Sequence, residues 1–213
     1  IITANTVIGN PDFEKMKQTN FSHYYFETFL DTYQRYPNSS ESFTILQNGI
    51  NERLYFPQFH AREHINLPMW MNLLQSNNKD FLEAFQYGCF SIDFVEKSNR
   101  RNNLMAAYDY YSDEDFLTIK ESIEDGLKLF ETIFSFKSES TVAPCYVWDS
   151  KIESLFFKNG VKYIQGSRFQ NVPVKNSNSF KRKFHYNGQL NEMGQFYLSR
   201  NALFEPSLNS SVD

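Results

Sequence analysis

The chain is poor in glycine, with 8 glycines among 213 residues. Glycine-rich loops cradle phosphate groups in nucleotide-binding proteins, and no Gly-x-x-x-x-Gly-Lys segment occurs here. The Gly-x-Ser-x-Gly turn that exposes the nucleophile of α/β-hydrolases is also missing. These absences argue against a P-loop nucleotide site and against a serine hydrolase of that type.

An excess of positive charge is lacking as well. The chain has 21 Lys and Arg against 25 Asp and Glu, a formal net charge of −4 and a pI near 5.6. Such a balance gives no electrostatic reason to expect a nucleic-acid or anionic-membrane partner. No apolar run approaches the length of a membrane-spanning helix. We therefore expect no nucleic acid and no membrane span. A cytoplasmic location is the expectation, although neither charge nor cysteine content decides the compartment.

Cysteine is scarce, since only Cys89 and Cys145 occur and they lie far apart in the sequence. Two distant cysteines do not indicate a disulfide framework, so both are interpreted as reduced, packed thiols. Cys145 next to Pro144 has the alternative of a nucleophile, but no neighbouring base in the sequence favours it.

Apolar and aromatic side chains are plentiful, at 41% and 17% of the residues. A chain of this length and composition can bury a substantial core, and we expect residues 1–213 to form one domain. Strand and helix patterns alternate along it with short links, which favours an α/β fold built as an open or closed barrel.

The expected elements follow from hydrophobic periodicity and capping residues. We expect strands at 1–9, 55–60, 90–94, 141–143, 161–164 and 195–199. A helix is expected to start at Asn10, and others to cover 24–36, 40–51, 67–74, 81–85, 113–134 and 150–158, with caps at Asn66, Ser112 and Ser150. Residues 165–191 are interpreted as a polar loop. The chain opens on an apolar run and closes on a polar one, so we expect a domain truncated at both ends.

Two of the four histidines lie four residues apart, at the end of an expected buried strand. If the chain turns helically after Phe59, His60 and His64 share one helix face. Two neutral imidazoles in that arrangement can bind one divalent cation. A chance pair of surface histidines is the alternative, and spacing alone does not separate the two. Position at the end of a strand, where α/β folds keep their sites, favours the metal interpretation.

A third metal ligand is not evident from the sequence. Asn5 and Asn10 belong to the opening stretch, and Asp12 already has a structural role as an acid at a helix start. Asp93 is possible but has no supporting pattern. Glu63 lies between the histidines and is expected to pair with Arg62 or another base.

His60-Ala61-Arg62-Glu63-His64 resembles the His-x-x-x-His metal motif of the NodB-type polysaccharide deacetylases. Further segments resemble a Bacteroidetes branch of these polysaccharide (de)acetylases, and they lie at 10–13, 59–64, 143–148, 160–166, 194–201 and 204–207. The matched segments extend over almost the whole chain.

The resemblance implies a distorted (β/α) barrel that holds a metal, usually zinc, with one aspartate and two histidines. His60 and His64 match the two histidines. Pro144 and Tyr146 fall in the family's Arg-Pro-Pro-Tyr segment, where the backbone N–H of the tyrosine helps to bind the oxyanion. Ala143 replaces the arginine of that segment. The paired aspartates are expected upstream of Ile1 and the catalytic histidine downstream of Asp213.

The function implied by the resemblance is metal-dependent removal of N- or O-linked acetyl groups from a polysaccharide. The alternatives are an inactive, glycan-binding barrel of the same fold, or a glycoside-cleaving relative with two carboxylates. Expected substrate-binding residues are Pro144, Tyr146, Trp148 and His185. For Trp148 a packing role is an equal alternative to stacking on a sugar ring, and His185 has the alternative of an ordinary loop residue.

Overall fold

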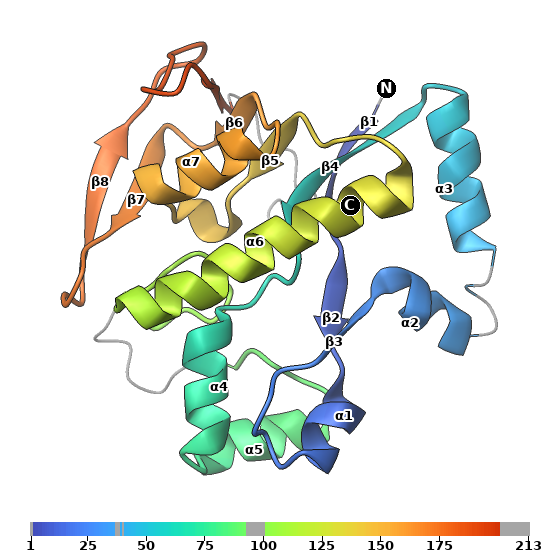
Figure 1. Ribbon diagram of the computed structural model, residues 1–213, viewed down its shortest axis with the longest axis vertical. Helices are drawn as coiled ribbons and strands as arrows, with labels where there is room; N and C mark the ends of the chain where they lie inside the picture. Colours follow the sequence, from blue (N-terminus) through green and yellow to red (C-terminus); the bar gives the residue numbers. More distant parts are fainter. Residues whose placement is uncertain (1, 37–38, 40, 93–100, 201–213) are drawn as a thin grey trace, which may run out of the picture.

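The computed structural model describes residues 2–36, 39, 41–92 and 101–200. Five parallel strands form the central sheet in the order β1–β4–β5–β6–β9 (Figure 1). Their bounds are β1 Ile2–Val7, β4 Tyr55–Ala61, β5 Ser140–Val142, β6 Tyr163–Gly166 and β9 Phe196–Ser199. Each strand lies beside the next strand of this sheet along the chain, so the order never reverses. The α/β class expected from the sequence is confirmed.

Two small antiparallel sheets accompany the central one. β2 Gly9–Pro11 pairs with β3 Phe26–Thr28, and β7 Phe169–Pro173 pairs with β8 Phe180–Phe184. Neither pair was expected from the sequence. The β7–β8 pair lies inside the stretch 165–191, which the sequence analysis interprets as a loop, because its alternation of polar and apolar residues is weak.

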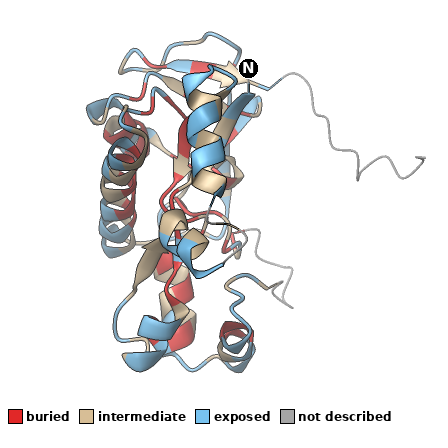
Figure 2. Cartoon of the chain, turned by 90° about the vertical axis from the view of Figure 1, so that its right-hand side faces the viewer, coloured by how far each residue is buried: buried red, intermediate tan, exposed pale blue. Residues whose placement is uncertain are grey.

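The helices of the described chain are α1 Phe13–Gln18, α2 Phe29–Arg35, α3 Ser42–Asn51, α4 Leu67–Gln75, α5 Lys79–Gln86, α6 Asp113–Phe134 and α7 Ser150–Lys158, with a short 3₁₀ turn at Pro144–Tyr146. The long helix α6 crosses β4, and α7 packs beside it (Figure 1). Figure 2 shows the buried residues where helices face the interior and the exposed ones on their outer sides.

Capping side chains fix most of the helix starts. Ser112 and Asp115 form the expected capping box of α6, and the Asn66 side chain accepts from the backbone of Met69 at the start of α4. Two expected starts are wrong. Asp12, not Asn10, caps α1, because Asn10 and Pro11 are held in β2. Asp149, not Ser150, caps α7.

Two expected elements differ more strongly from the structure. The helix expected at 24–36 is divided into β3 and α2, since the capping box of Thr28 and Asp31 starts a new helix at Phe29. The strand expected at 90–94 is not formed at 90–92, and its remaining residues lie outside the described part of the chain.

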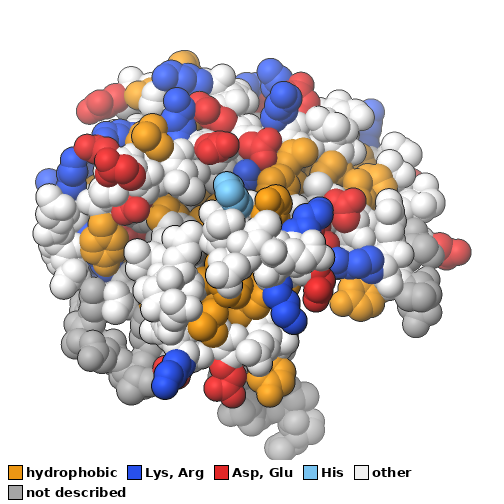
Figure 3. All heavy atoms as spheres, turned by 60° about the horizontal axis from the view of Figure 1, so that its bottom comes forward, with side chains coloured by type: hydrophobic (Ala, Val, Ile, Leu, Met, Phe, Trp, Pro, Cys, Tyr) orange, Lys and Arg blue, Asp and Glu red, His pale blue; other side chains and the backbone are white. Residues whose placement is uncertain are grey.

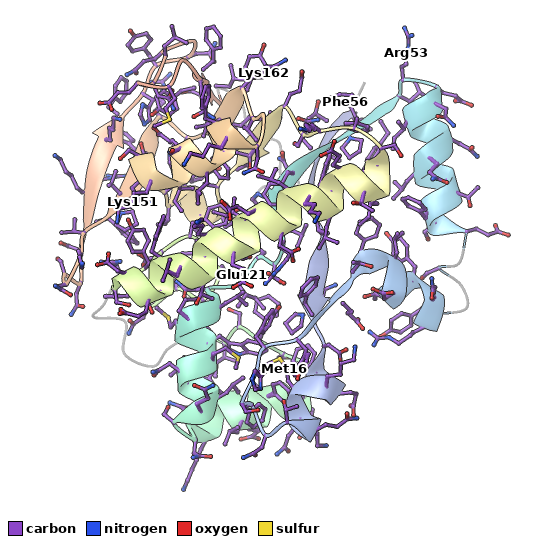
Figure 4. All side chains as sticks on the ribbon, in the orientation of Figure 1. Met16, Arg53, Phe56, Glu121, Lys151 and Lys162 are labelled. Carbon is purple, nitrogen blue, oxygen red and sulfur yellow. The ribbon has the colours of Figure 1, made fainter. Side chains whose placement is uncertain are left out.

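Two hydrophobic clusters hold the molecule together. The larger one fills the space between the sheet and helices α6 and α7, around Phe59, Phe130 and Phe156. The smaller one surrounds Trp70 and Met16 where α1, α4 and α5 meet (Figure 4). No described helix is long and apolar enough to cross a membrane.

Candidate functional site

The carboxyl ends of the five parallel strands lie along one edge of the sheet. In open α/β sheets this edge is where ligands bind. Three of the strands deliver polar side chains there: His60 is the penultimate residue of β4, Tyr146 follows β5, and Arg200 follows β9. These residues define the candidate site, together with His64.

His60 is tied to the neighbouring strand through its ring. The Nδ1 atom lies 2.5 Å from the carbonyl oxygen of Val142 on β5. A carbonyl only accepts, so Nδ1 carries the proton and Nε2 keeps its lone pair. Burial lowers the pKa of His60 to about 4, with a smaller contribution from the nearby charge of Arg200. His60 is therefore neutral at pH 7, the form that binds metals.

The ring of His64 lies against that of His60. Their centroids are 4.8 Å apart at an interplanar angle of 62°. The Nδ1 atom of His64 is buried and has no hydrogen-bond partner among the described residues. Burial lowers the pKa of His64 also, partly opposed by nearby backbone groups of His64 itself and Met105.

The backbone between the two histidines is not the expected helical turn. β4 continues to Ala61, and residues 62–65 form bends before Asn66 caps α4, which begins at Leu67. The two rings still lie side by side at the carboxyl end of the sheet, as expected from the sequence, because the bends after Ala61 bring their centroids within 4.8 Å of each other. Tyr108 supports this bend by donating from its hydroxyl to the carbonyl of His60 at 3.0 Å.

Arg200 and Tyr146 form a second polar pair at this edge. An Arg200 guanidinium nitrogen donates to the Tyr146 hydroxyl at 3.3 Å, and the Arg200 backbone N–H donates to the carbonyl of Gly166 at 2.9 Å. Local sequence patterns predict no role for Arg200. The sequence signal for Arg200 as a site residue is its position directly after the last strand, because that position places it at the carboxyl edge of the sheet.

The Tyr146 backbone N–H is not free to bind an oxyanion. It donates to the Ala143 carbonyl at 2.9 Å within the 3₁₀ turn. Cys145 and Tyr146 both have positive φ angles, 53° and 57°, and Pro144 is buried. The expected oxyanion role of the Tyr146 N–H and the expected substrate contact of Pro144 are therefore not available in this conformation.

Trp148 and His185 lie in the interior and not at the edge. Each is 1% exposed, and their rings stack with centroids 6.2 Å apart. The Trp148 indole donates to Glu153 at 2.9 Å, and His185 Nε2 lies 2.7 Å from the Gln170 side-chain oxygen. Neither ring can meet a sugar in this structure. The packing interpretation holds for Trp148, and the cleft-lining expectation for His185 is wrong.

The other candidate ligands have structural roles or lie elsewhere. Glu63 is 2% exposed and accepts from Arg62 at 2.7 Å, which is the pairing expected for it. Asp12 caps α1. Asn5 lies on β1 and Asn10 on β2. Asp93 lies outside the described residues.

Cys145 is half-buried and accepts a weak hydrogen bond from Asn103 at 3.4 Å. Burial raises the pKa of its thiol, which opposes a role as a nucleophile.

A groove of about 950 Å³ lies between β3, α4 and α6, and neither histidine lines it. Its walls mix basic side chains such as Lys120 with acidic ones such as Glu121 (Figure 4). Acidic and basic side chains are also interspersed over the underside of the molecule (Figure 3). A groove of mixed charge with no converging reactive groups is a weaker candidate than the histidine pair.

Within the described residues, no cluster of three or more His, Cys, Asp or Glu side chains is placed to hold a metal ion. The histidine pair is therefore a partial ligand set. Comparison of the chain with family models, with curated proteins and with solved structures gave no match.

Proposed function

We propose that the chain carries part of the active site of a metal-dependent hydrolase that removes acetyl groups from a polysaccharide. The observation that supports this most directly is the pair of neutral histidines at the carboxyl edge of a parallel sheet, with centroids 4.8 Å apart. The reaction is inferred from the resemblance to the NodB-type deacetylases, which involves His60–His64 and the segments around Tyr146 and Arg200.

The separation of the two rings supports a shared cation. Two imidazoles bound to one tetrahedral zinc at about 2.1 Å have ring centroids roughly 5 Å apart. A metal-binding histidine usually donates its other ring N–H to a carbonyl or carboxylate, as His60 does to Val142. The Nδ1 atom of His64 is buried and has no hydrogen-bond partner among the described residues, and a bound cation would satisfy it.

His60 and His64 would hold the cation, most simply zinc, and it would supply Lewis-acid activation of water and of the acetyl carbonyl. Within the described residues no cluster of three or more His, Cys, Asp or Glu side chains surrounds the pair. We propose that aspartates supply the remaining ligand and the general base, as the resemblance implies.

The chain's own contribution to substrate binding is assigned to Arg200 and Tyr146. The Arg200 guanidinium and the Tyr146 hydroxyl are hydrogen-bonded to each other and can both reach hydroxyl or carbonyl oxygens of a sugar. The positive charge of Arg200 near His60 would also favour a developing negative charge at this edge.

We propose further that the sheet belongs to a distorted (β/α) barrel. The sequential order of its parallel strands supports this, because a doubly wound sheet reverses its order at a switch point and a barrel does not. Within the described residues β1 and β9 are both edge strands, so the barrel would be closed by further strands.

Acetate release tests the proposal. The full protein is incubated with zinc and either an acetylated chitooligosaccharide or an acetylated xylan. His60→Ala and His64→Ala are expected to lower acetate release at least a hundredfold, and His23→Ala, an exposed histidine elsewhere, to leave it unchanged. Equal release by all four proteins would refute the assignment.

An inactive glycan-binding barrel is the second candidate. It is favoured by the incomplete ligand set and by the occupied N–H of Tyr146. Glycan binding by the full protein without acetate release from any acetylated substrate would support it over the hydrolase.

A further inference from the structure

Positive charge is concentrated in one part of a chain that is acidic overall. The whole sequence has 21 Lys and Arg against 25 Asp and Glu, but residues 154–191 contain no acidic residue. The cations of this stretch are Lys158, Lys162, Arg168, Lys175, Lys181, Arg182 and Lys183. The net negative charge of the whole chain therefore hides a local basic segment.

The structure gathers four of these cations on the β7–β8 hairpin and its base. Lys162 and Lys175 are paired with Glu139 and Asp113, each at 2.6 Å. Arg168, Lys181, Arg182 and Lys183 are exposed, and none of them forms an ion pair within the described residues. The hairpin stands at the left of Figure 1, with its turn projecting away from β6.

Exposed aromatic rings accompany these charges. Phe169 and Phe184 are cross-strand partners, 42% and 56% exposed, with centroids 5.6 Å apart. The guanidinium of Arg182 lies 4.6 Å from the centroid of the Phe169 ring. Tyr186, just after β8, is 64% exposed. Protection of an edge strand explains lysines, but it does not explain exposed phenylalanines beside them.

The combination fits a sugar polymer that carries carboxylates. Guanidinium and ammonium groups form charge-assisted hydrogen bonds with carboxylate oxygens. The apolar faces of aromatic rings can cover the C–H face of a pyranose ring. Nucleic acid carries one negative charge per about 1.7 Å of duplex and is attracted by extended basic surfaces. Here the basic surface is one hairpin on a protein of net charge −4.

The base of the hairpin lies on the same sheet edge as the histidine pair. β7 follows the carboxyl end of β6 after two residues, Ser167 and Arg168. β4 and β6 are the two neighbours of β5, so they are separated by two strand spacings, about 10 Å. A single oligosaccharide can therefore extend from the histidines to the hairpin.

We propose that the β7–β8 hairpin binds the carboxylates of an acidic polysaccharide, and that the substrate is a uronate-containing glycan. The identification of the substrate rests on the proposed function, whereas binding by the hairpin does not. Arg182 lies on the same face of the hairpin as Phe169 and Phe184 and supplies charge beside their ring surface. Lys181 and Lys183 add positive charge on the opposite face.

Binding to soluble polymers tests this directly. Calorimetric titration of the full protein compares polygalacturonate with neutral dextran and with single-stranded DNA. Wild-type protein is expected to bind polygalacturonate, and this binding should weaken as salt is added. No binding to dextran is expected. No binding to polygalacturonate, equal binding to dextran, or tighter binding to the DNA would overturn the proposal.

Variants assign the binding to the hairpin. Replacing Lys181, Arg182 and Lys183 together with Gln is expected to weaken polygalacturonate binding at least tenfold, and Phe184→Ala severalfold. The control replaces the exposed Lys17, Lys79 and Lys128 with Gln, so it has the same net charge as the hairpin variant. Its affinity for polygalacturonate should stay within twofold of that of wild type. Equal losses in both triple variants would show a nonspecific charge effect and contradict the hairpin site.

The histidine variant separates this proposal from the proposed function. His64→Ala is expected to keep full polygalacturonate binding even though acetate release is lost. Polygalacturonate binding by a wild-type protein that releases no acetate would leave the hairpin site intact and refute only the reaction. Loss of polygalacturonate binding in His64→Ala would contradict a separate hairpin site.

Discussion

Gly126 of α6 lies directly against the ring of Phe59 on β4. A Cβ atom at Gly126 would fall 2.9 Å from Cε2 of Phe59 and 2.8 Å from Cβ of Arg62. Phe59 precedes His60, so this close approach sets the position of the strand that carries the first histidine. The absence of a side chain at one helix residue thereby connects the packing of α6 to the geometry of the candidate site.

Gly126→Ala is expected to destabilise the protein. Alanine gains roughly 1 kcal/mol of helix propensity, but the overpacking against Phe59 and Arg62 costs about 1–3 kcal/mol. Urea denaturation should show a lower midpoint. Gly49→Ala in α3 is the control, because its added Cβ meets only Tyr55, at 3.2 Å, and should cost less. A Gly126→Ala protein more stable than wild type would contradict the packing described.

Gln58→Leu is expected to be severely destabilising. The buried side-chain oxygen of Gln58 accepts from the backbone N–H groups of Glu139 and Ser140 and from the hydroxyls of Ser138 and Ser140. Leucine would leave buried donors without partners, at about 1–3 kcal/mol each. The free energy of unfolding in urea measures the loss. Gln47→Leu on the exposed side of α3 serves as the control and should change stability little.

The buried histidine His185 predicts loss of stability in acid. Burial lowers its pKa from 6.5 to about 4, and the charge of Lys183 adds to the shift. The unfolded chain therefore binds a proton at a higher pH than the folded one, so stability is full above pH 6.5 and falls as the pH drops toward 4. Two and a half pKa units correspond to about 3 kcal/mol.

His185→Gln tests that assignment. The variant should lose the part of the pH dependence due to His185, so its urea midpoint should fall less between pH 7 and pH 4.5 than that of wild type. The groups packed around the ring, Trp148, Tyr197 and Gln170, do not titrate in this range. An unchanged pH profile would show that His185 takes up its proton equally well in the folded state.

Local patterns predicted many of the elements, but not the long-range pairing. The regular apolar spacing and capping box of α6 gave its bounds, 113–134, correctly. β7 and β8 do not follow from the sequence because their polar and apolar residues do not alternate regularly, and only their pairing with each other makes them strands. Tyr24 to Tyr36 has helical spacing throughout, yet its first part pairs with β2 and forms β3.

The site was predictable only in part, for the same reason. Spacing and position after a strand indicated His60 and His64, although by a helical geometry that the structure does not have. The hydrogen bond from His60 to Val142 joins residues 82 apart in sequence, and the burial of Trp148 and His185 depends on Glu153, Gln170 and Tyr197. Contacts of that kind leave no periodic signal in a single sequence.

Zinc binding by the full protein is the sharpest test of the histidine pair as a metal site, because it needs no substrate. Calorimetric titration at pH 7.5 of metal-free wild type, His60→Ala, His64→Ala and His23→Ala is the measurement. The account predicts one zinc per chain in wild type and in His23→Ala, and at least tenfold weaker binding in the other two. Zinc affinity that is the same in all four proteins, or no binding by wild type, would contradict it.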